Sequence, residues 1–85
     1  MNVALILNYK AATETISCIE SLRTHCRAID HIIVIDNDSQ DGSLVAFQTW
    51  QQEQAAHNVT VLANPENNGY AGGNNYGIRW AQANL

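Results

Sequence analysis

Apolar residues gather in short runs along the chain, separated by longer amphipathic stretches. The runs cover residues 3–7, 31–36 and 59–63. The first two are continuous rather than alternating, a pattern typical of strands that are buried on both faces of a parallel sheet. The pattern therefore predicts a strand at each run, with Asp36 at the end of the second.

The stretches between and after these runs show helical periodicity and predict helices over residues 12–26, 43–57 and 71–85. Their apolar positions are Ile16, Ile19, Leu22 or Arg23, and Cys26 in the first; Val45, Ala46, Phe47 and Trp50 in the second; and Ala71, Asn74, Ile78, Ala81 and Leu85 in the third. Each helix is therefore expected to lay one face on the sheet.

Strand and helix alternate as βαβαβα, which predicts an α/β fold with a parallel sheet and right-handed crossovers. We expect the strand order 3-2-1 with helices on both faces, which is one half of a doubly wound, Rossmann-like fold in three layers. No linker, repeat or low-complexity tract interrupts the pattern, so residues 1–85 are predicted to form a single domain.

Composition narrows the classes of function. The 85 residues are 46% hydrophobic and 14% charged, which is typical of a globular chain. The net charge is −4 with four Lys and Arg residues, which argues against a nucleic-acid partner. No apolar run approaches the roughly 18 residues of a membrane span, and the first residues resemble a strand more than a signal peptide. We expect a cytoplasmic protein, with peripheral attachment to the inner membrane left open for a longer form.

The two cysteines are predicted to be reduced. Cys18 and Cys26 are eight residues apart in one predicted helix, so they would lie about 12 Å apart at ~1.5 Å rise per residue. A disulfide needs Cα atoms within roughly 7 Å. Buried packing is the expected role of both, because free cysteine is among the most buried residue types.

Polar residues cluster where each predicted strand ends: residues 8–10, 36–43 and 64–75. In open α/β sheets, ligands bind beyond the carboxyl ends of the strands, so these clusters are expected to share one edge. A carboxylate at Asp36 could accept the N3–H of uracil or thymine, or bond a ribose hydroxyl. Capping its own loop is an equally open role for Asp36. Tyr9 could stack on a nucleobase or simply cover the sheet edge.

Two further features of these loops have both a chemical and a structural interpretation. Asp38 and Asp41 resemble a metal pair, but the Asn/Asp/Ser/Gly loop around them favours a turn residue and a helix N-cap. The glycine-rich residues 69–77 could cradle a phosphate or keep a helix close to the sheet. They do not match GxGxxG and follow the third strand, so an NAD(P)-binding oxidoreductase is disfavoured. Arg79 could reach a diphosphate or stay solvated.

Together, the segments LILNYK (5–10), IVIDNDSQDGS (33–43) and NPENNGYAGGNNYGI (64–78) resemble the N-terminal segment of family 2 glycosyltransferases, the inverting GT-A type. The rhamnosyltransferase-like members that build bacterial surface polysaccharides are the most similar. The resemblance implies the Rossmann-like half of a GT-A fold and a nucleotide-sugar-binding subdomain.

By position, the resemblance implies a donor site made of Asn8, Tyr9, Asp36, Asp38, Gly72, Gly73, Asn75 and Arg79. The implied substrates are a UDP- or dTDP-sugar, with rhamnose as a candidate sugar, and a polysaccharide or glycolipid acceptor. The family's Asp-x-Asp metal motif and its catalytic base would follow Leu85. No catalytic or metal residue is therefore assigned, Mg or Mn is expected only in a longer enzyme, and the chain alone is expected to be inactive.

The sequence also leaves open an alternative function and predicts self-association. The chain could instead be a non-catalytic remnant that binds nucleotide or packs against a partner. The apolar strand at residues 3–7 would lie at a sheet edge, which is a template for pairing. Self-association through this edge or the last helix is therefore predicted.

Overall fold

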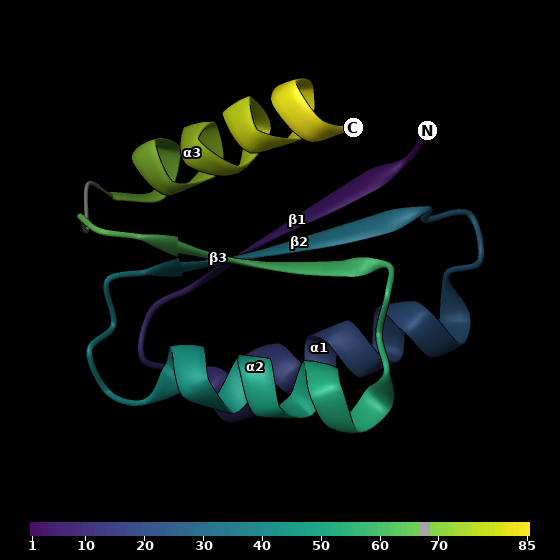
Figure 1. The fold of residues 1–85 in the computed structure, drawn as a ribbon, viewed down its shortest axis with the longest axis horizontal. Coiled ribbons are helices and arrows are strands. Elements are labelled where there is room, and N and C mark those ends of the chain that lie inside the picture. Colours follow the sequence, from purple (N-terminus) through teal and green to yellow (C-terminus); the bar gives the residue numbers. More distant parts are fainter. Residues whose placement is uncertain (67–68) are drawn as a thin grey trace.

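A computed structural model describes residues 1–66 and 69–85 of the chain, and strands and helices alternate along them (Figure 1). The elements are β1 (Val3–Asn8), α1 (Ala12–His25), β2 (His31–Asn37), α2 (Ser43–Gln54), β3 (Val59–Asn64) and α3 (Gly69–Asn84). The predicted βαβαβα order is confirmed.

The strands form a parallel sheet in the order β1-β2-β3, as predicted. Val3 pairs with His31 and Asn8 with Asp36 across β1 and β2, while Asn37 pairs with Asn64 across β2 and β3. Figure 1 shows α1 and α2 on one face of the sheet and α3 on the other. Because β2 is covered on both faces and flanked on both sides, its side chains from Ile32 to Asn37 are all buried.

Alternate residues of β2 supply two different cores. Ile32 and Val34 belong to the larger one, between the sheet and the two helices α1 and α2. That cluster also contains Ile19, Phe47, Trp50, Ala56 and Val59. Ile35 instead points toward α3, where it faces Gly77. This division explains why the apolar run of β2 is continuous, since successive side chains of a strand point to opposite faces.

Helix α3 approaches the sheet through glycine, which was one of the two roles predicted for residues 69–77 but differs from the predicted apolar face. Gly73 and Gly77 are buried, whereas Ile78 is 41% exposed and Leu85 is 47% exposed. A Cβ on Gly73 would collide with Leu7, and one on Gly77 would lie 2.8 Å from Ile35 Cδ1. The predicted stripe through Ile78 and Leu85 was wrong because backbone, rather than large side chains, makes the closest contact.

The other end of α3 is held by an aromatic contact. The ring of Trp80 stacks on that of His31 with centroids 6.2 Å apart, and a 2.7 Å hydrogen bond joins His31 Nε2 to Thr60 Oγ1. Helix α3 therefore runs along the sheet from the carboxyl ends of the strands, where Gly69 lies, to their amino ends. Its start at Gly69 is two residues earlier than predicted.

Several smaller predictions about helix ends and about burial were wrong. Cys18 and Cys26 are both exposed, and α1 ends at His25, before Cys26. Helix α2 ends at Gln54, three residues before the predicted boundary at His57, because Ala55 adopts a left-handed φ of 48°. Val45 is 64% exposed rather than part of the core. Among the described residues, no helix is long and apolar enough to cross a membrane.

Candidate functional site

The polar strand ends meet at one edge of the sheet, as the sequence predicted. The pairing of Asn8 with Asp36 and of Asn37 with Asn64 places the last residues of neighbouring strands side by side. The start of α3 lies at the same edge, because Asn37 Nδ2 donates to the carbonyl oxygen of Gly69 at 3.4 Å. Asn64 Nδ2 in turn donates to Asn37 Oδ1 at 2.6 Å. The edge is thus cross-linked by side-chain amides.

Asp36 lies at the centre of a buried hydrogen-bond network. Its Oδ1 atom accepts from Ser39 Oγ at 2.6 Å and from Asn8 Nδ2 at 3.0 Å. Thr15 Oγ1 donates to Asn8 Oδ1 at 2.7 Å, and the backbone N–H of Lys10 donates to Ser39 Oγ at 2.9 Å. The four side chains of Asp36, Ser39, Asn8 and Thr15 are at most 7% exposed. Their burial makes each of these bonds costly to lose.

The second carboxylate oxygen of Asp36 has a different environment. Within residues 1–66 and 69–85, both donors meet Oδ1, and no buried side-chain oxygen or nitrogen lacks a partner. Oδ2 receives no hydrogen bond from those residues, so it keeps some contact with solvent, although Asp36 as a whole is only 5% exposed. Asp36 is also one of the residues that line a surface pocket.

This pocket has a volume of about 250 Å³ and lies between the ends of β2 and β3 and the start of α2. It is lined by Asp36, Asp38, Gln40, Gly42, Ser43, Leu44, Val45, Ala63, Asn64 and Pro65. Pockets that enclose a whole small ligand are roughly 300–1,000 Å³. This one has room for part of a nucleotide, and its lining combines two aspartates with apolar residues.

The loop after β2 holds its shape through left-handed backbone and short side-chain bonds. Asp38 and Gln40 have φ angles of 57° and 55°, and Gln40 Nε2 donates to Asp38 Oδ1 at 2.9 Å. Asp38 is therefore in a turn, and it also lines the pocket.

Asp41 was predicted to cap α2, but Gly42, with φ 87°, is the capping residue. Asp41 Oδ1 instead accepts from Ser43 Oγ at 2.6 Å and from the Ser43 backbone N–H at 3.0 Å. These two hydrogen bonds, the hydroxyl first, lower the pKa of the Asp41 carboxyl below its usual 3.8. The Asp41 carboxylate thus stabilises the start of α2.

The comparison with protein families identifies the family of the chain. The model of the family described as "Glycosyl transferase family 2" matches residues 4–85, which is nearly the whole chain. The chain belongs to glycosyl transferase family 2. No curated protein and no solved structure matches it significantly. For this family 2 chain, the α/β fold and the parallel sheet agree with the Rossmann-like half of a GT-A fold.

Not every residue that the sequence suggested lies in the pocket of the family 2 chain. Tyr9 follows β1 on the far side of Asp36 from β3, its side chain is 47% exposed, and the Lys10 ammonium lies 5.2 Å from the centre of its ring. It is not among the pocket-lining residues within the described chain. Asn8 donates a hydrogen bond to Asp36 and is itself almost fully buried, at 1% exposure.

The predicted residues of α3 divide into two sets. Gly73 is buried against Leu7, and Gly72 beside it is half-buried. Asn75 and Arg79 are exposed. Two residues along a helix turn by about 200°, so both lie opposite the Gly73–Gly77 face and point away from the sheet. Arg79 is also roughly 9 Å further from the pocket edge than Gly73, at ~1.5 Å per residue. The structure does not bring these two side chains to Asp36.

Three residues of the site were missed by the sequence interpretation: Thr15, Asn37 and Ser39. Thr15 lies one helical turn before buried Ile19, so it is a polar residue on the core face of α1. That position is the signal that could have found it, because buried hydroxyls need partners. Ser39 is three residues after Asp36 in a turn-rich loop, and nothing in its spacing distinguished it from the neighbouring polar residues.

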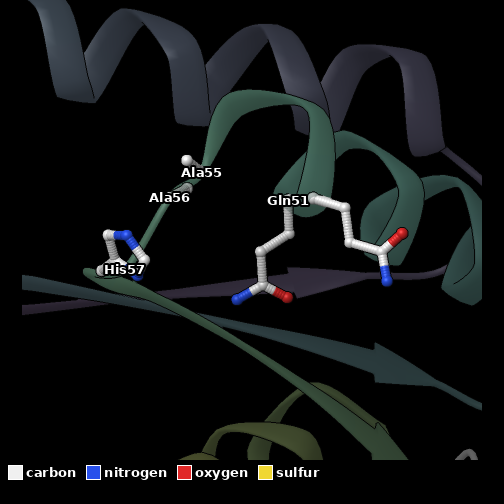
Figure 2. A pocket seen from close by; sticks show the side chains of 5 residues that line it. Gln51, Ala55, Ala56 and His57 are labelled. Atoms are coloured by element: carbon white, nitrogen blue, oxygen red, sulfur yellow. The ribbon is translucent and has the colours of Figure 1, made fainter.

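A larger hollow of about 520 Å³ lies at the opposite end of α2 and is lined by Gln51, Gln52, Ala55, Ala56 and His57 (Figure 2). It is near the start of β3, since Gln51 Nε2 donates to the carbonyl oxygen of Val59. It therefore lies away from the carboxyl ends of the strands and carries no carboxylate. Within the described residues, no group of three or more His, Cys, Asp and Glu side chains could hold a metal ion.

Proposed function

We propose that this family 2 chain binds the nucleotide of a UDP- or dTDP-sugar donor, with Asp36 Oδ2 accepting the N3–H of the pyrimidine base. The observation that carries the proposal is the asymmetry of the Asp36 carboxylate. One oxygen accepts from Ser39 and Asn8, the other accepts no hydrogen bond from the described residues, and Asp36 lines a pocket. A charged acceptor that is fixed and partly desolvated forms stronger hydrogen bonds than one in water.

The pocket supports a flat, partly apolar ligand. Leu44, Val45, Ala63 and Pro65 offer apolar surface beside the Asp36 and Asp38 carboxylates. In this proposal the base lies along these side chains, while Asp38 receives a polar group of the ribose. Tyr9, which is half-exposed at the same sheet edge, would close over the nucleotide after a rotation of its side chain.

The diphosphate is proposed to lie toward the start of α3. The N-terminal end of a helix carries a partial positive charge and free N–H groups that favour anions. Gly72, which is half-buried and has no side chain, leaves the backbone accessible there, whereas Gly73 contributes by keeping the helix start close to the sheet. Asn75 and Arg79 belong to this proposal only if the sugar diphosphate extends over the outer surface of α3.

The proposed donor sugar, acceptor and location rest on the resemblance to the rhamnosyltransferase-like members of the family. The proposed donor sugar is rhamnose, the proposed acceptor is a polysaccharide or a glycolipid, and the proposed location is the cytoplasm or the cytoplasmic side of the inner membrane. Mg or Mn is proposed for a longer form of the enzyme that also supplies the metal ligands and the base. We further propose that copies of this chain pair through β1.

The test is a calorimetric or NMR titration of the chain with UDP and dTDP, repeated with UDP methylated at N3. We expect wild-type protein to bind UDP and to discriminate against the methylated base. Asp36→Asn keeps an acceptor for Ser39 and Asn8 but places an NH2 group at the open position. It should weaken UDP binding roughly tenfold to a hundredfold, as expected for a hydrogen bond to a charged group.

Asp30→Asn is the matched control, because it makes the same charge change at the amino ends of the strands, away from the pocket. There Asp30 accepts a hydrogen bond from the Asn2 backbone N–H. It should leave UDP binding unchanged. Failure of wild-type protein to bind either nucleotide would contradict the proposal and favour a non-catalytic remnant. Binding without discrimination at N3, but still dependent on Asp36, would place the ribose rather than the base on this carboxylate.

A further inference from the structure

We infer that Ser39, Asn8 and Thr15 are positioning residues that fix the Asp36 carboxylate in the one orientation that presents Oδ2 to a ligand. The inference rests on the proposed function, because it concerns how the same carboxylate selects its base. It assigns a role in base selection to two residues, Ser39 and Thr15, that need not contact the nucleotide.

The hydroxyl of Ser39 accepts two hydrogen bonds and donates one, so its direction of donation is fixed. A serine hydroxyl has one proton to donate and two lone pairs to accept with. The Lys10 N–H donates to Ser39 Oγ at 2.9 Å, and Asn8 Nδ2 donates to it at 3.4 Å. With both lone pairs occupied, the proton is directed to Asp36 Oδ1, at 2.6 Å. Ser39 therefore holds that oxygen as a donor and cannot exchange roles.

The amide of Asn8 is fixed in the same manner by Thr15. Thr15 Oγ1 donates to Asn8 Oδ1 at 2.7 Å, so the oxygen of the amide points to α1 and its NH2 group points to Asp36 and Ser39. A reversed amide would place its oxygen against Asp36 Oδ1, where two acceptors repel each other. The Thr15 hydroxyl therefore decides the direction in which Asn8 donates, although the hydrogen bond of Thr15 is to Asn8 and not to Asp36.

These contacts have a common consequence for Asp36. Two donors converge on Oδ1, and rotation of the carboxylate by half a turn would exchange the two oxygens without changing the site. Smaller rotations would lengthen both bonds, so the plane of the carboxylate is set by Ser39 and Asn8. The direction of the Oδ2 lone pairs, and with it the position of an accepted N3–H, is set at the same time.

The experiment compares Ser39→Ala, Thr15→Val and Thr15→Ser with wild-type protein. The measured quantity is the ratio of the Kd for N3-methylated UDP to that for UDP. Ser39→Ala should lower this ratio about tenfold, since it removes a hydrogen bond to a charged group. Thr15→Val keeps the shape of the side chain without the hydroxyl and should lower the ratio by a smaller factor, whereas Thr15→Ser should retain the wild-type ratio.

A merely structural role would lower the melting temperature without changing that ratio. Gly77→Ala, which perturbs packing of α3 away from this network, serves as the control and should keep the wild-type ratio. If Ser39→Ala is unfolded, the Thr15 pair decides, because the hydrogen bond of Thr15 is to Asn8 and not to Asp36. An unchanged ratio in a folded Ser39→Ala or Thr15→Val overturns the inference while leaving the proposed function standing. Absence of wild-type discrimination at N3 overturns it together with the base contact on which it rests.

Discussion

At the scale of single residues, this protein uses side chains that are too small or too polar for an ordinary core. Gly77 brings the α3 backbone to the side chain of fully buried Ile35, and Thr15 places a hydroxyl on the core face of α1. Both choices are unfavourable locally, since glycine weakens a helix and a buried hydroxyl needs a partner. Both are explained by what lies opposite them in the folded chain.

The glycine contact gives a prediction about stability. Gly77→Ala gains up to about 1 kcal/mol of helix propensity. It also pushes a methyl group against Ile35, and such overpacking costs about 1–3 kcal/mol. We expect a net loss of about 1 kcal/mol in the free energy of unfolding, measured by urea denaturation.

A double-mutant cycle isolates the cause. Ile35→Val removes Cδ1, the atom that a Cβ on Gly77 would approach to 2.8 Å. In that background Gly77→Ala should cost little or become stabilising, which gives a coupling energy of about 1 kcal/mol. Additive effects of the two substitutions would show that the close approach is not what requires glycine.

At the scale of elements, hydrogen bonds from Ser43 to the Asp41 side chain stabilise the start of α2. Asp41 bonds both the hydroxyl and the backbone N–H of Ser43, while Gly42 between them takes the left-handed conformation. The pKa of Asp41 is lowered by these bonds, so their stabilising effect is complete above about pH 3.8 and is lost as the pH falls through the pKa of the folded chain.

Ser43→Ala removes the hydroxyl bond, which is the largest cause of the lowered pKa, and keeps the backbone N–H. We expect the pKa of Asp41, followed by carbon-detected NMR during an acid titration, to rise part of the way back to 3.8. Ser17→Ala, at an exposed serine of α1, should leave it at the wild-type value. An unchanged pKa in Ser43→Ala would mean that the hydroxyl does not stabilise the carboxylate.

At the scale of the whole molecule, the sheet is covered on both faces but has free edges. Figure 1 shows helices above and below the strands, and β1 lies at one side of the β1-β2-β3 order. The side chains of β1 from Val3 to Leu7 are all apolar, and an unpaired apolar strand is a template for a second chain.

Sedimentation velocity at increasing concentration tests this pairing. We expect wild-type protein to shift from monomer toward dimer, and Val3→Lys to stay monomeric, because charge at an edge strand opposes pairing. Val45→Lys makes the same change at an exposed apolar residue of α2 and should still dimerise. A wild-type chain that remains monomeric at millimolar concentration contradicts pairing through β1.

The sequence by itself determined the order of elements, the parallel sheet and the edge at which the polar residues meet. Continuous apolar runs and alternating helices admit few topologies, and parallel strands bring their carboxyl ends together whatever the details of packing. Asp36 could be singled out for the same reason, since it directly follows such a run.

Only the tertiary structure decided which side chains act together. The bonds from Thr15 to Asn8 and from Asn8 to Asp36 join α1, β1 and β2, so no spacing within one element encodes them. Ser39 is only three residues from Asp36, but its spacing did not distinguish it from the polar residues around it. The glycine-rich residues 69–77 allowed a helix packed close to the sheet, but the sequence did not show that Gly73 and Gly77 form its inner face, because glycine has no hydrophobic signal. Local patterns report what a residue prefers, whereas a buried polar or glycine contact depends on the partner that folding brings opposite it.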